Sequence, residues 1–231
     1  MDISLNFVHK GEGEVLILLH GNGENCTYFE NQIDCFARYF SVYALDTRGH
    51  GGSPRGTKPF TLAQFAEDLR GFMDENKIQK AHILGFSDGG NIAMLFALKY
   101  PERVNKLILN GANTKPSGMK LWCVADVYFE WLLWTAVSKL CRSESAAKKS
   151  ALFSLMAFEP DIETAQLAKL SMPTLVIAGT HDMIKTSHTK QIHRQISGSE
   201  LALIDGDHFI ASNQSEKFNE TVLSFLEKSD I

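Results

Sequence analysis

A short glycine-flanked turn, Gly85-Phe86-Ser87-Asp88-Gly89, joins a strand-like run to a helix-like one. Residues 81–84 before it are apolar and typical of a buried strand, while residues 90–98 after it favour a helix that ends before Pro101. G-x-S-x-G in this context is a nucleophile elbow, in which the serine sits on a sharp, strained turn with its hydroxyl raised out of the sheet. A phosphate-binding turn is the alternative, but the glycine spacing matches neither common nucleotide motif. We therefore interpret Ser87 as a nucleophile.

The rest of the chain alternates buried apolar runs with helix-like segments. This rhythm predicts a single α/β domain over residues 1–231, with a mostly parallel sheet flanked by helices on both faces. Sheets of this kind place active sites beyond the carboxyl ends of their strands. The remaining strands are expected at 15–19, 41–45, 106–110, 174–178 and 200–204, and the other helices at 25–39, from 61 onward and at 215–228.

One stretch, residues 114–168, interrupts the alternation with helical patterns and no clear strand. An insertion at the carboxyl edge of the sheet lies where a lid would lie, so a short helical lid is expected here. It carries all three tryptophans of the chain, Trp122, Trp131 and Trp134. These side chains are candidates for contacts with substrate in an apolar pocket; the alternative is that they pack the insertion onto the body.

Composition narrows the functional classes. The chain is 22% charged and 44% hydrophobic with a net charge of −4, which offers no basic patch for nucleic acid. Residues 1–7 lack the pattern of a signal peptide. The apolar stretch 121–137 is interrupted by Asp126 and Glu130, which argues against a membrane span. Four cysteines form no C-x-x-C pair, so a reduced, cytoplasmic protein is expected. The oligomeric state is not predicted.

A serine nucleophile needs a base within hydrogen-bond reach and a third group that orients the base. His208 follows the last predicted strand and is therefore expected at the same edge as Ser87. Asp182 follows the preceding strand and is the expected acid, while Asp205 and Asp207 are rivals that we interpret as turn residues. The serine–aspartate–histidine order along the chain is that of the nucleophile-elbow enzymes.

The negative charge that develops on a substrate carbonyl needs backbone N–H donors. One is the amide of Asp88, directly after the nucleophile. The other is expected from the loop His20-Gly21-Asn22-Gly23, which follows the strand at 15–19, with Asn22 as the donor. Neither metal-ligand spacings nor flavin or nicotinamide motifs are present, so no metal and no cofactor are predicted.

Together these motifs resemble the α/β-hydrolase superfamily over essentially the whole chain. The resemblance implies the α/β-hydrolase fold, an acyl-enzyme mechanism and no cofactor, but it does not fix the substrate. The matching segments, in chain order, are His20-Gly21-Asn22-Gly23, Asp46-Thr47-Arg48-Gly49-His50-Gly51, Gly85 to Gly89, Gly179 to Asp182 and Gly206-Asp207-His208.

A narrower resemblance involves the elbow with its following glycine and the segment Asn110-Gly111-Ala112-Asn113, which are similar to the valacyclovir hydrolase (biphenyl hydrolase-like) branch. That resemblance implies that Asp88 helps to hold the ammonium group of an α-amino acid ester. A carboxylate beside the nucleophile favours a cationic acyl group and repels an anionic one. Alternatively, Asp88 complements the dipole at the start of the following helix. The insertion is also shorter than the lid of that branch.

The sequence therefore predicts a serine hydrolase that cleaves a carboxylic ester or a similar small acyl compound. A lactonase, a carbon–carbon bond hydrolase, a perhydrolase and an acyltransferase share the same machinery and stay open. A haloalkane dehalogenase is disfavoured, because it uses aspartate at the position of Ser87. A receptor that binds a small apolar ligand on the same fold is the alternative from another class.

Overall fold

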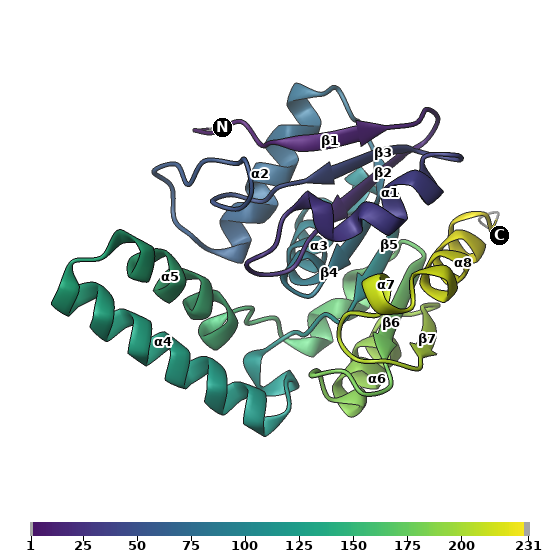
Figure 1. Ribbon diagram of the computed structural model, residues 1–231. Coiled ribbons are helices and arrows are strands. Elements are labelled where there is room, and N and C mark those ends of the chain that lie inside the picture. The colour runs from purple at the N-terminus through teal and green to yellow at the C-terminus, as the bar shows by residue number, and fades with distance from the viewer. Residues whose placement is uncertain (1, 229–231) are drawn as a thin grey trace.

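The computed structural model describes residues 2–228 and contains a seven-stranded sheet covered by helices (Figure 1). The first residue and the last three of the predicted domain lie outside the described range. The strands are β1 (Phe7–Lys10), β2 (Val15–Leu19), β3 (Ser41–Leu45), β4 (Ala81–Phe86), β5 (Val104–Asn110), β6 (Thr174–Gly179) and β7 (Glu200–Ile204). The helices are α1 (Glu30–Phe36), α2 (Leu62–Glu75), α3 (Asp88–Lys99), α4 (Leu121–Cys141), α5 (Glu144–Phe158), α6 (Thr186–Gln195), α7 (Ile210–Asn213) and α8 (Ser215–Leu226).

The strand order is β1-β3-β2-β4-β5-β6-β7. Only β1 is antiparallel to its neighbour, β3; all other neighbouring pairs are parallel. The predicted α/β-hydrolase fold with a mostly parallel, helix-flanked sheet is confirmed. Because β2, β4, β5, β6 and β7 run the same way, the loops after them meet at one edge of the sheet.

Apolar residues fill both faces of the sheet, as the continuous hydrophobic strands require. In β2, Ile17 and Leu19 point to the face covered by α2, α3 and α6. Leu16 and Leu18 point to the opposite face, which α1 and α8 cover. These strand residues are almost completely buried, and the sheet is a rigid platform for the loops at its carboxyl edge.

The helix expected at 25–39 is shorter than predicted. A 3-10 turn spans Cys26–Phe29, and α1 covers only Glu30–Phe36. Asn25 caps the turn by accepting a hydrogen bond from the Thr27 amide at 2.9 Å, and the Cys26 amide donates to Asp46 Oδ1 at 2.7 Å. The first amides of a helix have no acceptor within it, so these side chains cap the start of the turn. Asp46 also ties this loop to the end of β3.

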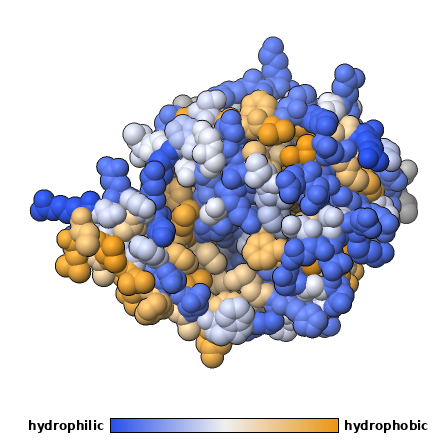
Figure 2. Space-filling model, in the orientation of Figure 1, coloured by the Kyte–Doolittle hydropathy of each residue, from blue (hydrophilic) through white to orange (hydrophobic). Residues whose placement is uncertain are grey.

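The segment between β5 and β6 forms a helical hairpin that we call the arm, made of α4 and α5. The two helices lie side by side and extend away from the sheet (Figure 1). Much of the outer face of α4 is apolar and exposed, including Trp122, Phe129 and Leu140, and Figure 2 shows hydrophobic residues gathered over this part of the molecule. Within residues 2–228, no helix combines the length and apolar character needed to cross a membrane.

Candidate active site

Ser87 lies at the junction of β4 and α3 in a backbone conformation that is rare for a residue with a side chain. Its φ is 53° and its ψ is −119°. The Ser87 amide donates to the carbonyl of Asn110 at 2.8 Å, and its carbonyl accepts from the Asn91 amide at 3.0 Å. The neighbouring strand and helix therefore hold the strained turn in place, which is how such strain persists in a folded protein.

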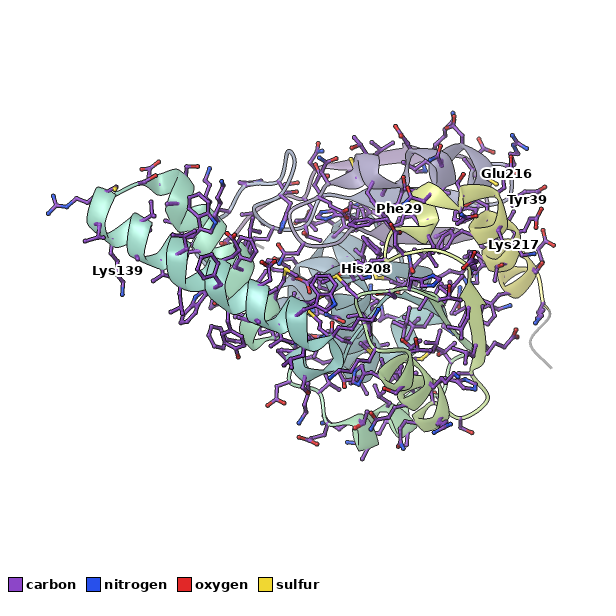
Figure 3. The ribbon with its side chains drawn as sticks, turned by 60° about the horizontal axis from the view of Figure 1, so that its bottom comes forward. Phe29, Tyr39, Lys139, His208, Glu216 and Lys217 are labelled. Carbon is purple, nitrogen blue, oxygen red and sulfur yellow. The ribbon has the colours of Figure 1, made fainter. Side chains whose placement is uncertain are left out.

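The three residues predicted as a triad come together at the carboxyl edge of the sheet. His208 Nε2 lies 3.0 Å from Ser87 Oγ, and His208 Nδ1 lies 2.7 Å from Asp182 Oδ1. His208 and Asp182 are both buried. In Figure 3, His208 lies near the base of the arm, whereas Lys139 lies toward its far end. This geometry connects a hydroxyl, an imidazole and a carboxylate in series, as proton transfer from a serine requires.

Gly111, directly after β5, is packed against this series. Its φ is +60°, and a Cβ placed on it would lie 2.8 Å from His208 Cε1 and 3.3 Å from Asp182 Oδ2. Asp182 is also oriented by the Ile184 amide, which donates to Asp182 Oδ1 at 2.8 Å. Gly111 was not among the predicted site residues. Its sequence signals were its position immediately after a predicted strand and its place in the segment Asn110-Gly111-Ala112-Asn113.

The loop after β2 approaches the elbow closely. A Cβ on Gly89 would lie 2.1 Å from the carbonyl oxygen of Leu19, so only glycine permits this approach. Among residues 2–228, the backbone amides of Asn22 and Asp88 donate to no protein group. Asp88 is the first residue of α3, where amides have no acceptor within the helix. Two unpaired donors beside the Ser87 hydroxyl are what an oxyanion hole would require.

A second acid, Glu159, lies with Asp88 beside Ser87. Asp88 is buried, its Oδ1 accepts from Asn91 Nδ2 at 3.2 Å, and its Oδ2 has no partner. Burial raises the pKa of Asp88 to about 6, and the nearby Glu159 adds to the rise. The side-chain amides of Asn22 and Asn91 oppose it. Burial also raises the pKa of Glu159.

Both acids line a small cavity of about 10 Å³, which is room for about one water molecule. Glu159 follows α5 and was missed by sequence reasoning, because nothing in the sequence indicates that the end of the arm folds back onto the elbow. The cavity is lined by Ser87, Asp88, Asn113, Met119, Met156, Glu159, Met183 and Ile184.

Glu24 is a further acid near the site that the sequence did not single out. Its Oε2 accepts from the Gly21 amide at 3.0 Å. Burial raises the pKa of Glu24 to about 7, although the Gly21 amide and the nearby His208 both lower it. Glu24 therefore holds the loop that contains Asn22 and contributes to the electrostatic environment of the imidazole.

The three tryptophans do not line the cavity beside Ser87. Trp122 is 67% exposed on α4. Trp131 packs edge-on against Phe158 with 4.8 Å between ring centroids, and Trp134 Nε1 donates to Glu130 at 2.7 Å. All three belong to the arm, and their role in binding substrate stays a prediction.

A parallel sheet that displays serine, aspartate and histidine in this order at one edge defines the α/β hydrolases. The α/β hydrolase fold family matches residues 14–140, more than half of the chain. The chain therefore belongs to this family.

Among its relatives, the 3-oxoadipate enol-lactonase 2 of Acinetobacter baylyi is 26% identical over 98% of this chain and 94% of the enzyme. The human serine hydrolase BPHL is 28% identical over 97% of this chain and 84% of that protein. Among solved structures, Est816, described as an N-acyl homoserine lactone degrading enzyme, superposes with a TM-score of 0.78 at 27% identity, covering 96% of this chain and 97% of Est816. The chain is thus a distant relative of BPHL and of enol-lactonases.

Proposed function

We propose that this chain is a serine hydrolase that cleaves a carboxylic ester or a similar small acyl substrate. The observation that carries the proposal is the continuous series Ser87–His208–Asp182, with contacts of 3.0 and 2.7 Å. Both distances are within the range in which a base activates a hydroxyl nucleophile and an acid orients the base. A scaffold role accounts for none of these contacts.

In the proposed mechanism, Ser87 Oγ attacks the carbonyl carbon while His208 Nε2 takes the hydroxyl proton. Asp182 keeps the proton of His208 on Nδ1 and stabilises the imidazolium that forms. The amides of Asn22 and Asp88 bind the oxyanion of the tetrahedral intermediate. Collapse of this intermediate expels the alcohol, which receives the proton from His208. Water, deprotonated by His208, then attacks the acyl-enzyme, and His208 returns this proton to Ser87 Oγ as the acid is released.

A lactone is a second substrate class that the relatives favour. Two of them are named for lactone chemistry, and a lactone is a cyclic ester that the same series of residues would open. A carbon–carbon bond hydrolase with the same triad and a small-ligand receptor on this fold are further candidates. A receptor would bind its ligand with negligible steady-state turnover.

For an ester substrate, Asp88 and Glu159 support a preference for an acyl group that carries an ammonium close to the carbonyl. The cavity beside Ser87 contains an unpartnered oxygen of Asp88, and an ammonium group is comparable in size to the water molecule that fits there. A cation between the two carboxyls would relieve the cost of burying them. We propose that the substrate lies against the arm, where its apolar parts contact Trp122, Trp131 and Trp134. The segment 114–168, which contains the arm, would then serve as the lid.

The enzyme is expected to act on a small molecule without a cofactor and to work in the cytoplasm, where its four unpaired cysteines would stay reduced.

The proposal is tested by the steady-state hydrolysis of matched esters by the native protein and by Ser87→Ala. The panel pairs p-nitrophenyl esters of acyl chains with the corresponding α-amino acyl esters and adds a γ-lactone. Loss of the serine should lower kcat by about 10⁴-fold or more. A preference for the amino esters that disappears in Asp88→Asn would assign the ammonium to Asp88. Turnover that survives Ser87→Ala would overturn the proposal.

A further inference from the structure

A cavity near the site lies between the arm and the loop after β3. It has a volume of about 530 Å³, within the range of about 300–1,000 Å³ typical of ligand pockets. One wall is formed by α5 and includes Lys148 and Leu152, and the other is formed by the loop and includes Arg55 and Phe60. We call this cavity the arm groove. It is many times larger than the space beside Ser87.

The arm groove is connected to the candidate active site through α5. Leu152 lines the groove, and Met156, one helical turn later, lines the cavity that contains Ser87. The Leu152 carbonyl also accepts a hydrogen bond from Asn22 Nδ2 at 2.8 Å, which joins the groove wall to the loop of the oxyanion hole. The groove and the cavity beside Ser87 therefore adjoin along one helix, with Leu152 and Met156 a single turn apart on α5.

Two cations face the groove from opposite walls. The Arg55 guanidinium lies over the Phe60 ring, 4.5 Å from its centroid, and donates to the Lys58 carbonyl at 2.8 Å. Among residues 2–228, neither Arg55 nor Lys148 has a carboxylate within 4.0 Å. Both positive charges are thus available to a ligand.

The nearby acids do not neutralise these cations. Asp2 is already bound by Arg48, with 2.6 Å between Oδ1 and Nη2. Burial, followed by repulsion from Arg48, lowers the pKa of Arg55, and the attraction of Asp2 only partly opposes this. Glu144, one turn before Lys148 on α5, forms no ion pair with it. The groove is therefore a locally positive site on a chain whose net charge is −4.

We propose that the arm groove binds an anionic group of the substrate, so that the natural ester carries a carboxylate or another oxyanion remote from the scissile bond; this rests on the function proposed above. Lys148 and Met156 are eight residues apart, which is about 12 Å along a helix. The anionic group is expected at about that distance from the carbonyl that Ser87 attacks. Guanidinium and ammonium groups on facing walls suit such an anion, and the apolar residues between them suit a methylene chain.

The charged side chains beside Ser87 and those in the arm groove are opposite in sign. The acids Asp88 and Glu159 line the cavity beside Ser87, and the cations Arg55 and Lys148 line the arm groove. A carboxylate close to the carbonyl would be repelled by the acids, whereas one at the end of a long chain would reach the cations. The length of the acyl chain and the charge at its end are therefore expected to determine KM together.

The test uses two p-nitrophenyl esters of the same ten-carbon diacid, one with a free distal carboxylate and one with that carboxylate blocked as a methyl ester. The four-carbon diacid monoester, whose carboxylate stays near Asp88, is the length control. The variants are Arg55→Met, Lys148→Met and their combination. Lys149→Met is the matched control, because Lys149 Nζ lies 3.9 Å over the Trp134 ring and does not line the groove.

The double variant should raise KM for the ten-carbon carboxylate by about tenfold, or about 1.4 kcal/mol. Its kcat should change less than twofold, and KM for the methyl ester should stay constant. Lys149→Met should behave like the native protein on both substrates. Equal KM values for the two ten-carbon esters in the native protein, or a preference that the double variant retains, would overturn the proposal.

A binding measurement separates this inference from the proposed function. Calorimetric titration of Ser87→Ala with the monoamide of the ten-carbon diacid needs no turnover, because this compound keeps the distal carboxylate and has an uncharged carbonyl at the other end. Its binding should weaken by about tenfold when Arg55 and Lys148 are also replaced by methionine. If no ester is hydrolysed but this difference in binding is found, the groove assignment stands and the hydrolase proposal fails. If the esters are hydrolysed but the monoamide does not bind, the groove assignment fails alone.

Discussion

At the residue scale, the carboxyl of Asp88 lies where burial makes its negative charge unfavourable to folding. It is buried beside Ser87, one of its oxygens has no partner among residues 2–228, and its pKa is raised from 3.8 to about 6. A carboxyl with a raised pKa in the folded state binds its proton more tightly there than in the unfolded chain. Its contribution to stability is therefore present at acid pH and is lost as pH rises through about 4 to 6.

Asp88→Asn should consequently stabilise the protein at neutral and higher pH. The shift from 3.8 to about 6 corresponds to a gain of at most about 3 kcal/mol in the free energy of unfolding at pH 8, with little gain at pH 4. Urea unfolding of both proteins at the two pH values measures the difference. A stability gain of the same size at both pH values would show that the charge of Asp88 is not its cause.

A second prediction concerns Gly111, because His208 packs so closely against it that no side chain fits between them. Gly111→Ala introduces a Cβ 2.8 Å from His208 Cε1 at a φ of +60°. Displacing the imidazole by a fraction of an ångström to about 1 Å should lower kcat by about 100-fold, and the left-handed backbone should reduce the free energy of unfolding by about 1–2 kcal/mol. Ester turnover and thermal unfolding test both effects. Unchanged kcat in a folded variant would contradict the packing described here.

Sequence reasoning proposed Ser87, Asp182 and His208 because each follows a predicted strand, and strand ends meet at one edge of a parallel sheet. The structure brings these three side chains together. Glu159 and Glu24 could not be proposed in this way. Glu159 reaches the elbow only because the arm returns to the sheet, and Glu24 acts through a backbone amide, so neither has a sequence signature.

At the element scale, the elbow depends on how closely α3 approaches β2. Gly89→Ala would place a Cβ 2.1 Å from the Leu19 carbonyl oxygen and 2.6 Å from that of His20. The strand and helix would have to separate, so a loss of about 3 kcal/mol or more in the free energy of unfolding is expected.

Gly198→Ala is the matched control for this substitution. Its Cβ would meet nothing within 4 Å, although its φ is +70°. It should cost only the backbone strain of about 1–2 kcal/mol. Chemical unfolding compares the two variants directly. A Gly89→Ala variant no less stable than Gly198→Ala would contradict the close packing of the elbow.

The strands were predictable because runs such as Val15–Leu19 are apolar at every position, which identifies strands buried on both faces. The bounds of the helix expected at 25–39 were not predictable, because its first turn is a 3-10 turn whose Cys26 amide is diverted to Asp46 at the end of β3. Such a diversion depends on a side chain from another part of the chain, which a local pattern does not contain.

At the scale of the whole molecule, the order of motifs along the chain was sufficient to predict the sheet and the edge that carries the site. The arm was predictable as a helical insertion but its direction was not, because α4 is apolar around most of its circumference and so does not indicate which face is buried. The arm groove follows from that direction, and its cations come from α5 and a loop that are distant in sequence.

The central claim, that Ser87 is a nucleophile activated by His208 and Asp182, is tested most directly by labelling with a fluorophosphonate and locating the adduct by mass spectrometry. This reagent requires an activated serine but no knowledge of the substrate. A single adduct on Ser87 is expected, absent in Ser87→Ala and formed at least about 100-fold more slowly in His208→Ala, because the base is then missing. Absence of an adduct in the folded native protein, or labelling of Ser87 at an unchanged rate without His208, would contradict the account.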